Sequence, residues 1–177
     1  MKNPWRTLKT KIVYQNPYWK AIDYTVIQPD KVKSNYYVVD TNDFVSIIPI
    51  DNKKETYLVR QWRYPIKQNS WENPQGLMDR NEKPLTAAKR ELLEETGLTA
   101  KKWIKVKHKI YTSNGFVTQG FYIFIARELT MQKSKRDGTE NDMIVKKSPL
   151  SQVYKMIGQG KIDDGPTIIS FYYLNLF

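Results

Sequence analysis

One helix-length segment in the middle of a strand-rich chain constrains the fold more than any other feature. Pro84 suits the first turn of a helix, and Gly97 suits the left-handed position just beyond its last turn. Before this helix come runs of β-branched and aromatic residues that are typical of strands, at residues 21–27, 36–39, 44–50 and 56–62. Such a chain is expected to form sheet layers with helices packed on their faces.

Similar patterns continue after Gly97. Strands are expected at residues 103–111, 120–126 and 143–147. Ser148 is expected to cap a second helix that has Pro149 as its first residue, and a third helix is expected from about Pro166. With 177 residues the chain is long enough for a single core. Because strands and helices both occur in it, the predicted fold class is α/β.

The net charge of +11 raises the alternative of a nucleic-acid binder. The lysines are spread along the whole chain, however, and in residues 101–110 they alternate with apolar residues, as in a strand with one solvated face. A nucleic-acid partner is therefore not favoured. A basic surface would instead attract a small anionic substrate.

The composition also limits the compartment. There is no cysteine for a disulfide or a thiolate metal site, and no apolar run approaches the roughly 20 residues that a bilayer span needs. The N-terminus carries no apolar stretch of signal-peptide length. A cytoplasmic protein without membrane contact is expected.

Three carboxylates gather near the end of the central helix. Glu91 and Glu95 are four residues apart and Glu91 and Glu94 are three apart, so all three fall on one face. The helix macrodipole is negative at this end and disfavours acidic residues by several tenths of a kcal/mol each. The arrangement makes sense if the carboxylates bind a hard divalent cation such as Mg²⁺.

The segment that contains these carboxylates resembles the Nudix box, G-x5-E-x7-R-E-U-x-E-E-x-G-U, where U is apolar. It reads GLMDRNEKPLTAAKRELLEETGL from Gly76 to Leu98, and it matches at every position. The resemblance implies a Nudix-type α/β/α sandwich with a mixed β-sheet, and Mg²⁺, or Mn²⁺ in its place, as cofactor. The residue roles that it implies are metal binding by Glu91, Glu94, Glu95 and the carbonyl of Gln75, loop shaping by Gly76 and Gly97, and alignment of the loop with the helix by Glu82 and Arg90.

The run before the box, TYLVRQWRYPIKQNSWENPQG, is similar to the corresponding strand and loop of ADP-ribose and ADP-sugar pyrophosphatases in this family. By this resemblance Arg63 would bind a substrate phosphate, with Arg60 as the second candidate, and Glu72 would accept hydrogen bonds from a base or ribose. Trp62 and Trp71 are expected to pack in the core, with stacking on a purine as the alternative.

The N-terminal run VYQNPYWKAIDYTVIQPD resembles the same branch, whose extension often crosses a two-fold dimer and supplies an aromatic residue to the partner's site. Tyr18 and Trp19 are the candidates for that substrate contact, and a hydrophobic contact within one subunit is the alternative. A homodimer is expected. Residues 1–42 are predicted to be an N-terminal β extension in the dimer interface, and residues 43–177 the Nudix hydrolase domain.

The general base in this branch comes from a loop beyond the box. Glu140, in KSKRDGTENDM, is the first candidate and Asp142 the second, although a plain surface loop has the same composition. Glu140 therefore joins Glu91 and Glu95 as a predicted catalytic residue. The single histidine, His108, is expected to point inward from its strand in a structural role.

The predicted reaction is Mg²⁺-dependent hydrolysis of the pyrophosphate bond of a nucleoside diphosphate joined to another group. ADP-ribose or an ADP-sugar is favoured, giving a nucleoside monophosphate and a sugar phosphate. The alternatives are hydrolysis of GDP-mannose or of RNA 5′ ends, and a non-catalytic nucleotide-binding module. The complete set of box carboxylates argues against the last alternative.

Overall fold

The computed structural model describes residues 2–106, 108–132 and 142–176. Its strands and helices, in chain order, are β1 (Arg6–Gln15), β2 (Trp19–Ile27), β3 (Lys33–Thr41), β4 (Phe44–Pro49), β5 (Glu55–Arg63), β6 (Gln68–Glu72), β7 (Gln75–Leu77), α1 (Pro84–Thr96), β8 (Leu98–Lys105), β9 (Ile110–Tyr111), β10 (Gly120–Met131), β11 (Ile144–Pro149), α2 (Leu150–Gly158) and α3 (Gly165–Leu174). No helix among the described residues is long and apolar enough to cross a membrane.

The chain forms two compact units. The first comprises Met1–Asp43 and Tyr111–Gly120, and the second comprises Phe44–Ile110 and Phe121–Phe177. In the first unit β1, β2 and β3 make an antiparallel sheet in that order. Every residue of β1 is exposed, whereas β2 buries Ile22 and Val26. The expected N-terminal β extension is therefore present. Its strands β2 and β3 are longer than the predicted strands at residues 21–27 and 36–39, and β1 was not predicted.

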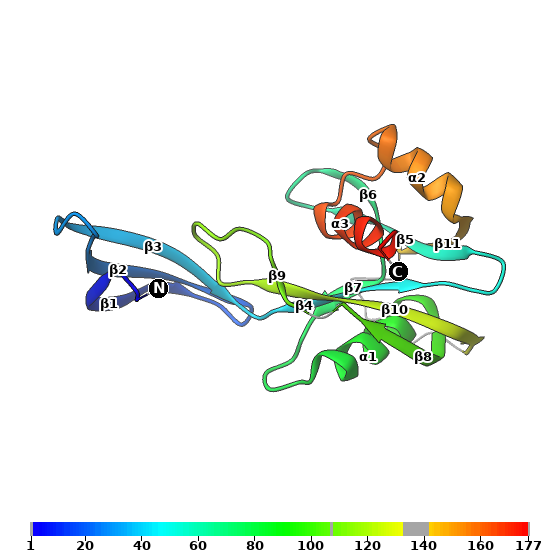
Figure 1. The fold of residues 1–177 in the computed structure, drawn as a ribbon, viewed down its shortest axis with the longest axis horizontal. Helices are drawn as coiled ribbons and strands as arrows, with labels where there is room; N and C mark the ends of the chain where they lie inside the picture. The colour runs from blue at the N-terminus through cyan, green and yellow to red at the C-terminus, as the bar shows by residue number, and fades with distance from the viewer. Residues whose placement is uncertain (1, 107, 133–141, 177) are drawn as a thin grey trace. The chain divides into compact units, whose positions relative to one another are not determined.

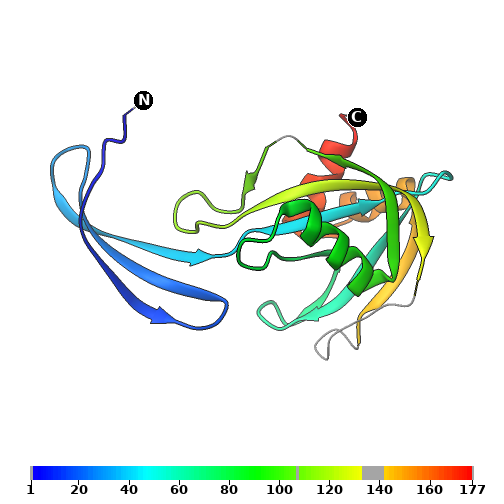
Figure 2. The same ribbon diagram turned by 90° about the horizontal axis from the view of Figure 1, so that it is seen from below.

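The second unit contains two sheets, one in the order β7-β4-β10-β8 with β9 beside β10, and one in the order β11-β5-β6. Strand β10 pairs parallel to β4 and antiparallel to β8, so the larger sheet is mixed, as predicted. Figures 1 and 2 show α1 on one side of these strands and α2 with α3 on the other.

The core of the second unit has one layer on each side of the mixed sheet. Alternate residues of β4 face opposite ways: Ile48 packs with Phe171 of α3, whereas Ile47 packs with Leu92 of α1. A strand buried on both faces is apolar at nearly every position, as β4 is. The predicted α/β/α sandwich is confirmed.

The start of α2 differs from the prediction. Ser148 does not cap a helix, because it is buried in β11 opposite Thr56 of β5. Pro149 takes the N-cap position instead, and α2 begins at Leu150. Pairing with β5 continues to Pro149, two residues beyond the predicted strand end at residue 147, so the helix begins one residue later than the Ser-Pro signal indicated.

The strand expected at residues 103–111 is also divided. Strand β8 begins earlier, at Leu98, and ends at Lys105, and β9 is a separate short strand. His108 lies between them and is exposed, so the predicted inward orientation is wrong. Its Nε2 lies 2.9 Å from the hydroxyl of Tyr173 on α3, which is a structural contact.

Candidate active site

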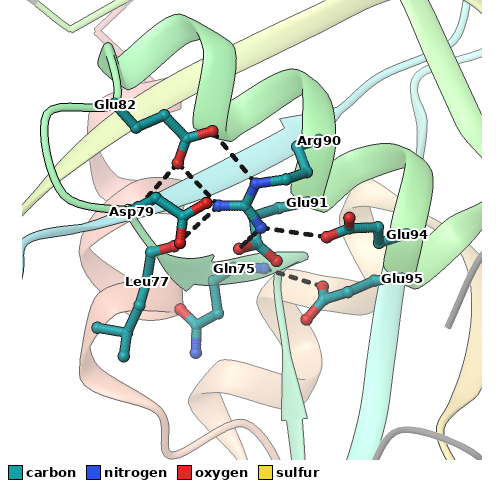
Figure 3. A network of polar contacts seen from close by, with 8 residues as sticks. All are labelled: Gln75, Leu77, Asp79, Glu82, Arg90, Glu91, Glu94 and Glu95. Carbon is teal, nitrogen blue, oxygen red and sulfur yellow. Dashed lines mark hydrogen bonds and ion pairs between the residues drawn. The ribbon is translucent and has the colours of Figure 1, made fainter. Parts of the chain in front are cut away.

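The ends of α1 are set by local sequence. Pro84 occupies the first turn, where a missing N–H costs nothing. Gly97 follows the last turn with φ 71°, and its N–H donates to the carbonyl of Leu93 at 2.9 Å. The predicted helix is therefore confirmed at both ends. The three acidic residues lie on its last two turns, beside β7 (Figure 3).

Two of these carboxylates are buried. Glu91 is 6% exposed and Glu95 is 2% exposed, whereas Glu94 is partly exposed. The backbone N–H of Gln75 donates to Oε2 of Glu95 at 3.0 Å. Because β7 pairs with β4, the sheet holds this N–H in place. Burying acidic groups next to each other is costly unless a cation or hydrogen bonds compensate.

Gly76 leaves room for the carboxylate of Glu91. A Cβ at position 76 would lie 2.2 Å from Cδ of Glu91 and 2.3 Å from each of its oxygens. No side chain fits at that distance without moving the carboxylate. The glycine therefore lets the Glu91 carboxylate lie directly against β7.

Arg90 joins the loop before α1 to the carboxylates of the helix (Figure 3). Its Nε and Nη2 donate to Glu82 at 3.2 and 2.9 Å, and Nη1 donates to Glu91 at 2.6 Å and to Glu94 at 3.1 Å. Nη2 also donates to the carbonyl of Leu77 at 2.9 Å. Hydrogen bonds from Arg90 hold the pKa of the Glu82 carboxyl below its ordinary value, and those to Glu82 contribute most to raising the pKa of Arg90.

Glu82→Gln is expected to lower the free energy of unfolding by about 1–3 kcal/mol at pH 7, because it breaks a two-point charged contact in a largely buried site. The depressed pKa makes this contribution pH-dependent: it is full above the unfolded pKa, near 4.5, and disappears as pH falls through the lower folded value. Urea unfolding of both proteins between pH 7 and pH 3 measures it. A difference that stays constant over this range would contradict the ion-pair explanation.

Arg63 and Glu72 form a second charged contact. Glu72 is 2% exposed; Nε of Arg63 donates to its Oε1 at 2.8 Å, and Nη2 forms an ion pair with Oε2. Nε2 of Gln75 donates to Oε2 of Glu72 at 2.8 Å. The hydrogen bonds to Glu72 raise the pKa of Arg63. Gln75 thus touches Glu72 through its side chain and Glu95 through its backbone, which links the pair to α1.

A cavity of about 500 Å³ adjoins this pair. It is lined by Arg63, Pro65, Ile66, Gln68, Ser70, Glu72, Asp163, Asp164 and Gly165. Its volume lies within the range of small-molecule sites. Charged side chains that line a cavity of this size are suited to orienting a polar ligand.

The chain matches the family model described as NUDIX domain over residues 41–167. The chain belongs to the NUDIX family.

Several curated relatives of this NUDIX protein are similar over most of their length. The ADP-ribose pyrophosphatase of Bacillus subtilis is 31% identical over 84% of this chain and 80% of its own. A methanol dehydrogenase activator of Bacillus methanolicus is 28% identical over 97% and 92%. The GDP-mannose pyrophosphatase of Citrobacter koseri is 30% identical over 86% and 84%.

A solved structure titled as an ADP compounds hydrolase is similar to this NUDIX chain with a TM-score of 0.86. It covers 97% of this chain and 92% of its own, and it is 19% identical. At that identity the similarity shows the fold alone. It bears out the predicted Nudix-type sandwich with its N-terminal strands.

NUDIX family members generally need divalent metal ions. The donors here suit such an ion, because Glu91, Glu94 and Glu95 offer hard oxygens on one helix face. Oε1 of Gln75 is buried and has no hydrogen-bond partner. In the described part of the chain no three acidic or histidine side chains converge on one point, and Arg90 donates hydrogen bonds to both Glu91 and Glu94.

Arg60, the second candidate for phosphate binding, does not line the cavity beside Glu72. The pairing of β5 with β6 puts Arg60 opposite Trp71, on the other face of the sheet from Arg63 and Glu72, and its guanidinium lies 5.5 Å from the Trp71 ring centre. Trp71 packs against the core as expected. Trp62 is 51% exposed, so core packing is wrong for that residue, because its strand position faces solvent.

Tyr18 and Trp19 belong to the first unit. Their backbone N–H groups both donate to Oδ1 of Asn16 at 2.8 Å, in the turn between β1 and β2. Tyr18 is 70% exposed, and the Trp19 ring lies 4.9 Å from that of Tyr14. Trp19 therefore has an aromatic contact within its own unit, while Tyr18 is free to contact another molecule.

The structure describes only one of the two candidates for the general base. Glu140 lies outside the described residues. Asp142 lies inside them and is exposed, two residues before β11. Both assignments stay predictions.

Sequence reasoning missed Asp164. This residue caps α3, where its Oδ2 accepts from the N–H and hydroxyl of Thr167 at 2.9 and 2.6 Å, and it lines the cavity beside Glu72. Burial raises its pKa. Asp followed by Gly165 and Pro166 is a recognisable N-cap signal, but nothing in the sequence places this cap next to Glu72.

Proposed function

We propose that this protein hydrolyses the pyrophosphate bond of a nucleoside diphosphate joined to a second group, using Mg²⁺, with ADP-ribose or an ADP-sugar as substrate. The observation that supports it most is the position of two buried carboxylates of the box, Glu91 and Glu95, against β7. Gln75 hydrogen-bonds both Glu95 and Glu72, and so connects these carboxylates to the Arg63–Glu72 pair. The products would be a nucleoside monophosphate and a sugar phosphate.

Glu91, Glu94, Glu95 and the carbonyl of Gln75 would hold the cation, with Mn²⁺ as a substitute. When bound, a divalent cation neutralises diphosphate charge and acidifies the attacking water. Arg90 sits among these carboxylates and would limit their mutual repulsion before the cation arrives. Gly76 would keep Glu91 in position, and Gly97 would end the helix just beyond Glu95.

Arg63 is proposed to bind a substrate phosphate, and Glu72 to orient it and to accept from a ribose or base. Nε and Nη2 of Arg63 are held by Glu72, while its Nη1 makes no hydrogen bond within the described residues and is available to a phosphate oxygen. An arginine held in this way loses little side-chain entropy on binding. Arg60 remains the second candidate, although it lies on the other face of the sheet.

The chemical step is attack of water on one phosphorus atom with departure of the bridging oxygen on the other phosphate. A carboxylate removes the proton from the water as the P–O bond breaks. Glu140 is proposed for this role, and Asp142 is the alternative. Both belong to the segment that leads into β11, which pairs with the strand carrying Arg63.

GDP-mannose is the second candidate substrate, because a GDP-mannose pyrophosphatase is 30% identical to this chain. An assay with a panel of substrates distinguishes the ADP-sugar assignment from GDP-mannose. The panel contains ADP-ribose, ADP-glucose, GDP-mannose, NADH and diadenosine polyphosphates with Mg²⁺, and the phosphate released is measured after coupling to a phosphatase. We expect kcat/KM for an ADP-linked sugar to exceed that for GDP-mannose by about tenfold or more, a difference of about 1.4 kcal/mol in transition-state free energy.

The same panel on Glu95→Gln is the control for contaminating phosphatases. Higher kcat/KM for GDP-mannose would replace the ADP-sugar assignment by the second candidate. No hydrolysis of any compound above the level of the control would overturn the enzymatic proposal and favour a non-catalytic module.

A homodimer that uses residues 1–42 as an interface, with residues 43–177 as the hydrolase domain, is proposed in addition. Supporting it, β1 exposes Leu8, Ile12, Val13 and Tyr14 on a strand with no buried residue. Tyr18 and Trp19 would contact substrate in the partner's site. A monomeric mass in sedimentation equilibrium at micromolar concentration would count against this arrangement. A cytoplasmic location stays a prediction.

A further inference from the structure

The sheet formed by β11, β5 and β6 has different side chains on its two faces. In the β5–β6 register Val59 is opposite Glu72, whereas Arg60 is opposite Trp71. Directly opposed residues share a face and neighbours along a strand alternate. Glu72 and Trp71 therefore point to opposite sides of the sheet, and only the Glu72 side belongs to the candidate active site.

A second cavity, of about 430 Å³, lies on the Trp71 side. Strands β6 and β11, helix α2 and the turn after α2 enclose it, and we call it the Trp71 cavity. Helix α2 packs against β11 here. It shares Gln68 and Asp163 with the cavity beside Glu72. The side chains that matter for binding and line only the Trp71 cavity are Asn69, Trp71, Lys146, Gln152 and Lys161.

The Trp71 cavity carries unneutralised positive charge. Lys146 and Lys161 form no ion pair with a described carboxylate, and the ammonium of Lys146 lies 5.7 Å from the Trp71 ring centre. The next residue, Lys147, shows the contrast, since it lies 2.7 Å from both Asp51 and Glu55.

One acidic residue, Asp163, also lines the Trp71 cavity. Its Oδ2 accepts from Nε2 of Gln68 at 2.9 Å, so its carboxylate is engaged at the rim. Two lysines against one engaged carboxylate leave an excess of positive charge. A concave surface of that sign concentrates anions.

We propose that the Trp71 cavity binds a phosphate monoester whose other part carries hydroxyl groups. Lys146 and Lys161 would bind the phosphate as charged donors. The amides of Asn69 and Gln152 both donate and accept, which matches hydroxyl groups. The shared chemistry covers sugar phosphates and nucleoside monophosphates alike.

Asn69, Trp71, Lys146, Gln152 and Lys161 do not line the cavity beside Glu72, so binding here does not require the proposed catalysis. The test follows the indole N–H signal of Trp71 by NMR, assigned by its loss in Trp71→Phe. The protein is titrated with inorganic phosphate, glucose 1-phosphate and AMP, with glucose as the uncharged control, in EDTA and again in Mg²⁺. We expect a saturable shift with at least one monoester, the same in both buffers, and none with glucose.

Lys146→Met and Lys161→Met are each expected to weaken binding about tenfold, or about 1.4 kcal/mol. Lys155→Met is the matched control, because it removes the same charge from an exposed position on α2 outside the cavity. The double variant Lys146→Arg/Lys161→Arg should retain most of the binding and show that loss of charge, not misfolding, explains the methionine variants.

Several results would overturn the proposal. One is no saturable Trp71 shift with any phosphate; another is equal affinity in the two methionine variants and the parent; a third is equal weakening by Lys155→Met.

On the substrate panel, Lys146→Met/Lys161→Met should hydrolyse within about twofold of the parent, since neither lysine is on the Glu72 side. Parallel loss of hydrolysis and of Trp71 binding would assign the phosphate to the active site instead. If the parent hydrolyses nothing, the titration still decides the cavity.

Discussion

Glu95→Gln is expected to lower kcat by about 10³-fold or more and to leave the fold intact. The metal contributes several kcal/mol of charge stabilisation at the transition state, and each 1.36 kcal/mol or so is tenfold in rate. Glutamine has the same size and can still accept the N–H of Gln75 through its amide oxygen, but it brings no negative charge. The loss should therefore fall on metal binding and turnover.

Turnover with saturating Mg²⁺ and Mn²⁺ affinity by calorimetry measure this effect. Glu128→Gln is the matched control, because it removes the same charge from an exposed ion pair with Lys102 on the surface of the same unit. Glu140→Gln should differ from both: it should slow turnover and keep metal affinity. If Glu95→Gln works as fast as the parent, the hydrolysis does not depend on Glu95, and both the metal assignment and the hydrolase proposal are wrong.

Gly76→Ala is expected to lower kcat by about 10²-fold. A methyl group would lie 2.2 Å from Cδ of Glu91, and a flexible carboxylate end can swing away more easily than β7 can separate from α1. The protein should therefore fold, with the Glu91 oxygens displaced. A shift of about 1 Å in a positioned group costs on the order of 10²-fold in rate.

Gly158→Ala is the control for adding a methyl group, because a Cβ there meets nothing within 4 Å and helix α2 gains a better helix former. Turnover and thermal unfolding of both variants separate a local displacement from loss of fold. Normal turnover in Gly76→Ala would mean that the position of the Glu91 carboxylate does not matter to the reaction.

Local patterns were reliable where their causes are local. Pro84 and Gly97 marked the ends of α1 because a missing N–H and a positive φ are properties of one residue each. Ser148 failed as a helix cap for the opposite reason. Its preference competed with β-pairing to Thr56, a residue distant in sequence.

The site divides in the same way. Spacing along one helix put Glu91, Glu94 and Glu95 on one face, and the structure keeps them there. The Arg63–Glu72 contact joins residues nine apart across a β-hairpin, so the sequence indicated both side chains but not that they bind each other. Asp164 lies beside Glu72 only because α3, which it caps, packs next to this hairpin, and the sequence did not indicate that packing.

The amino-acid sequence by itself determined the family, the central helix with its acidic face, and the alternation of strands and helices, because these depend on spacing along the chain. Only the tertiary structure decided which face of the β5–β6 hairpin carries Arg63 and which carries Arg60, and how closely β7 approaches α1 at Gly76. Strand register and interlayer distance arise from the packing of segments far apart in sequence, and no local pattern encodes them.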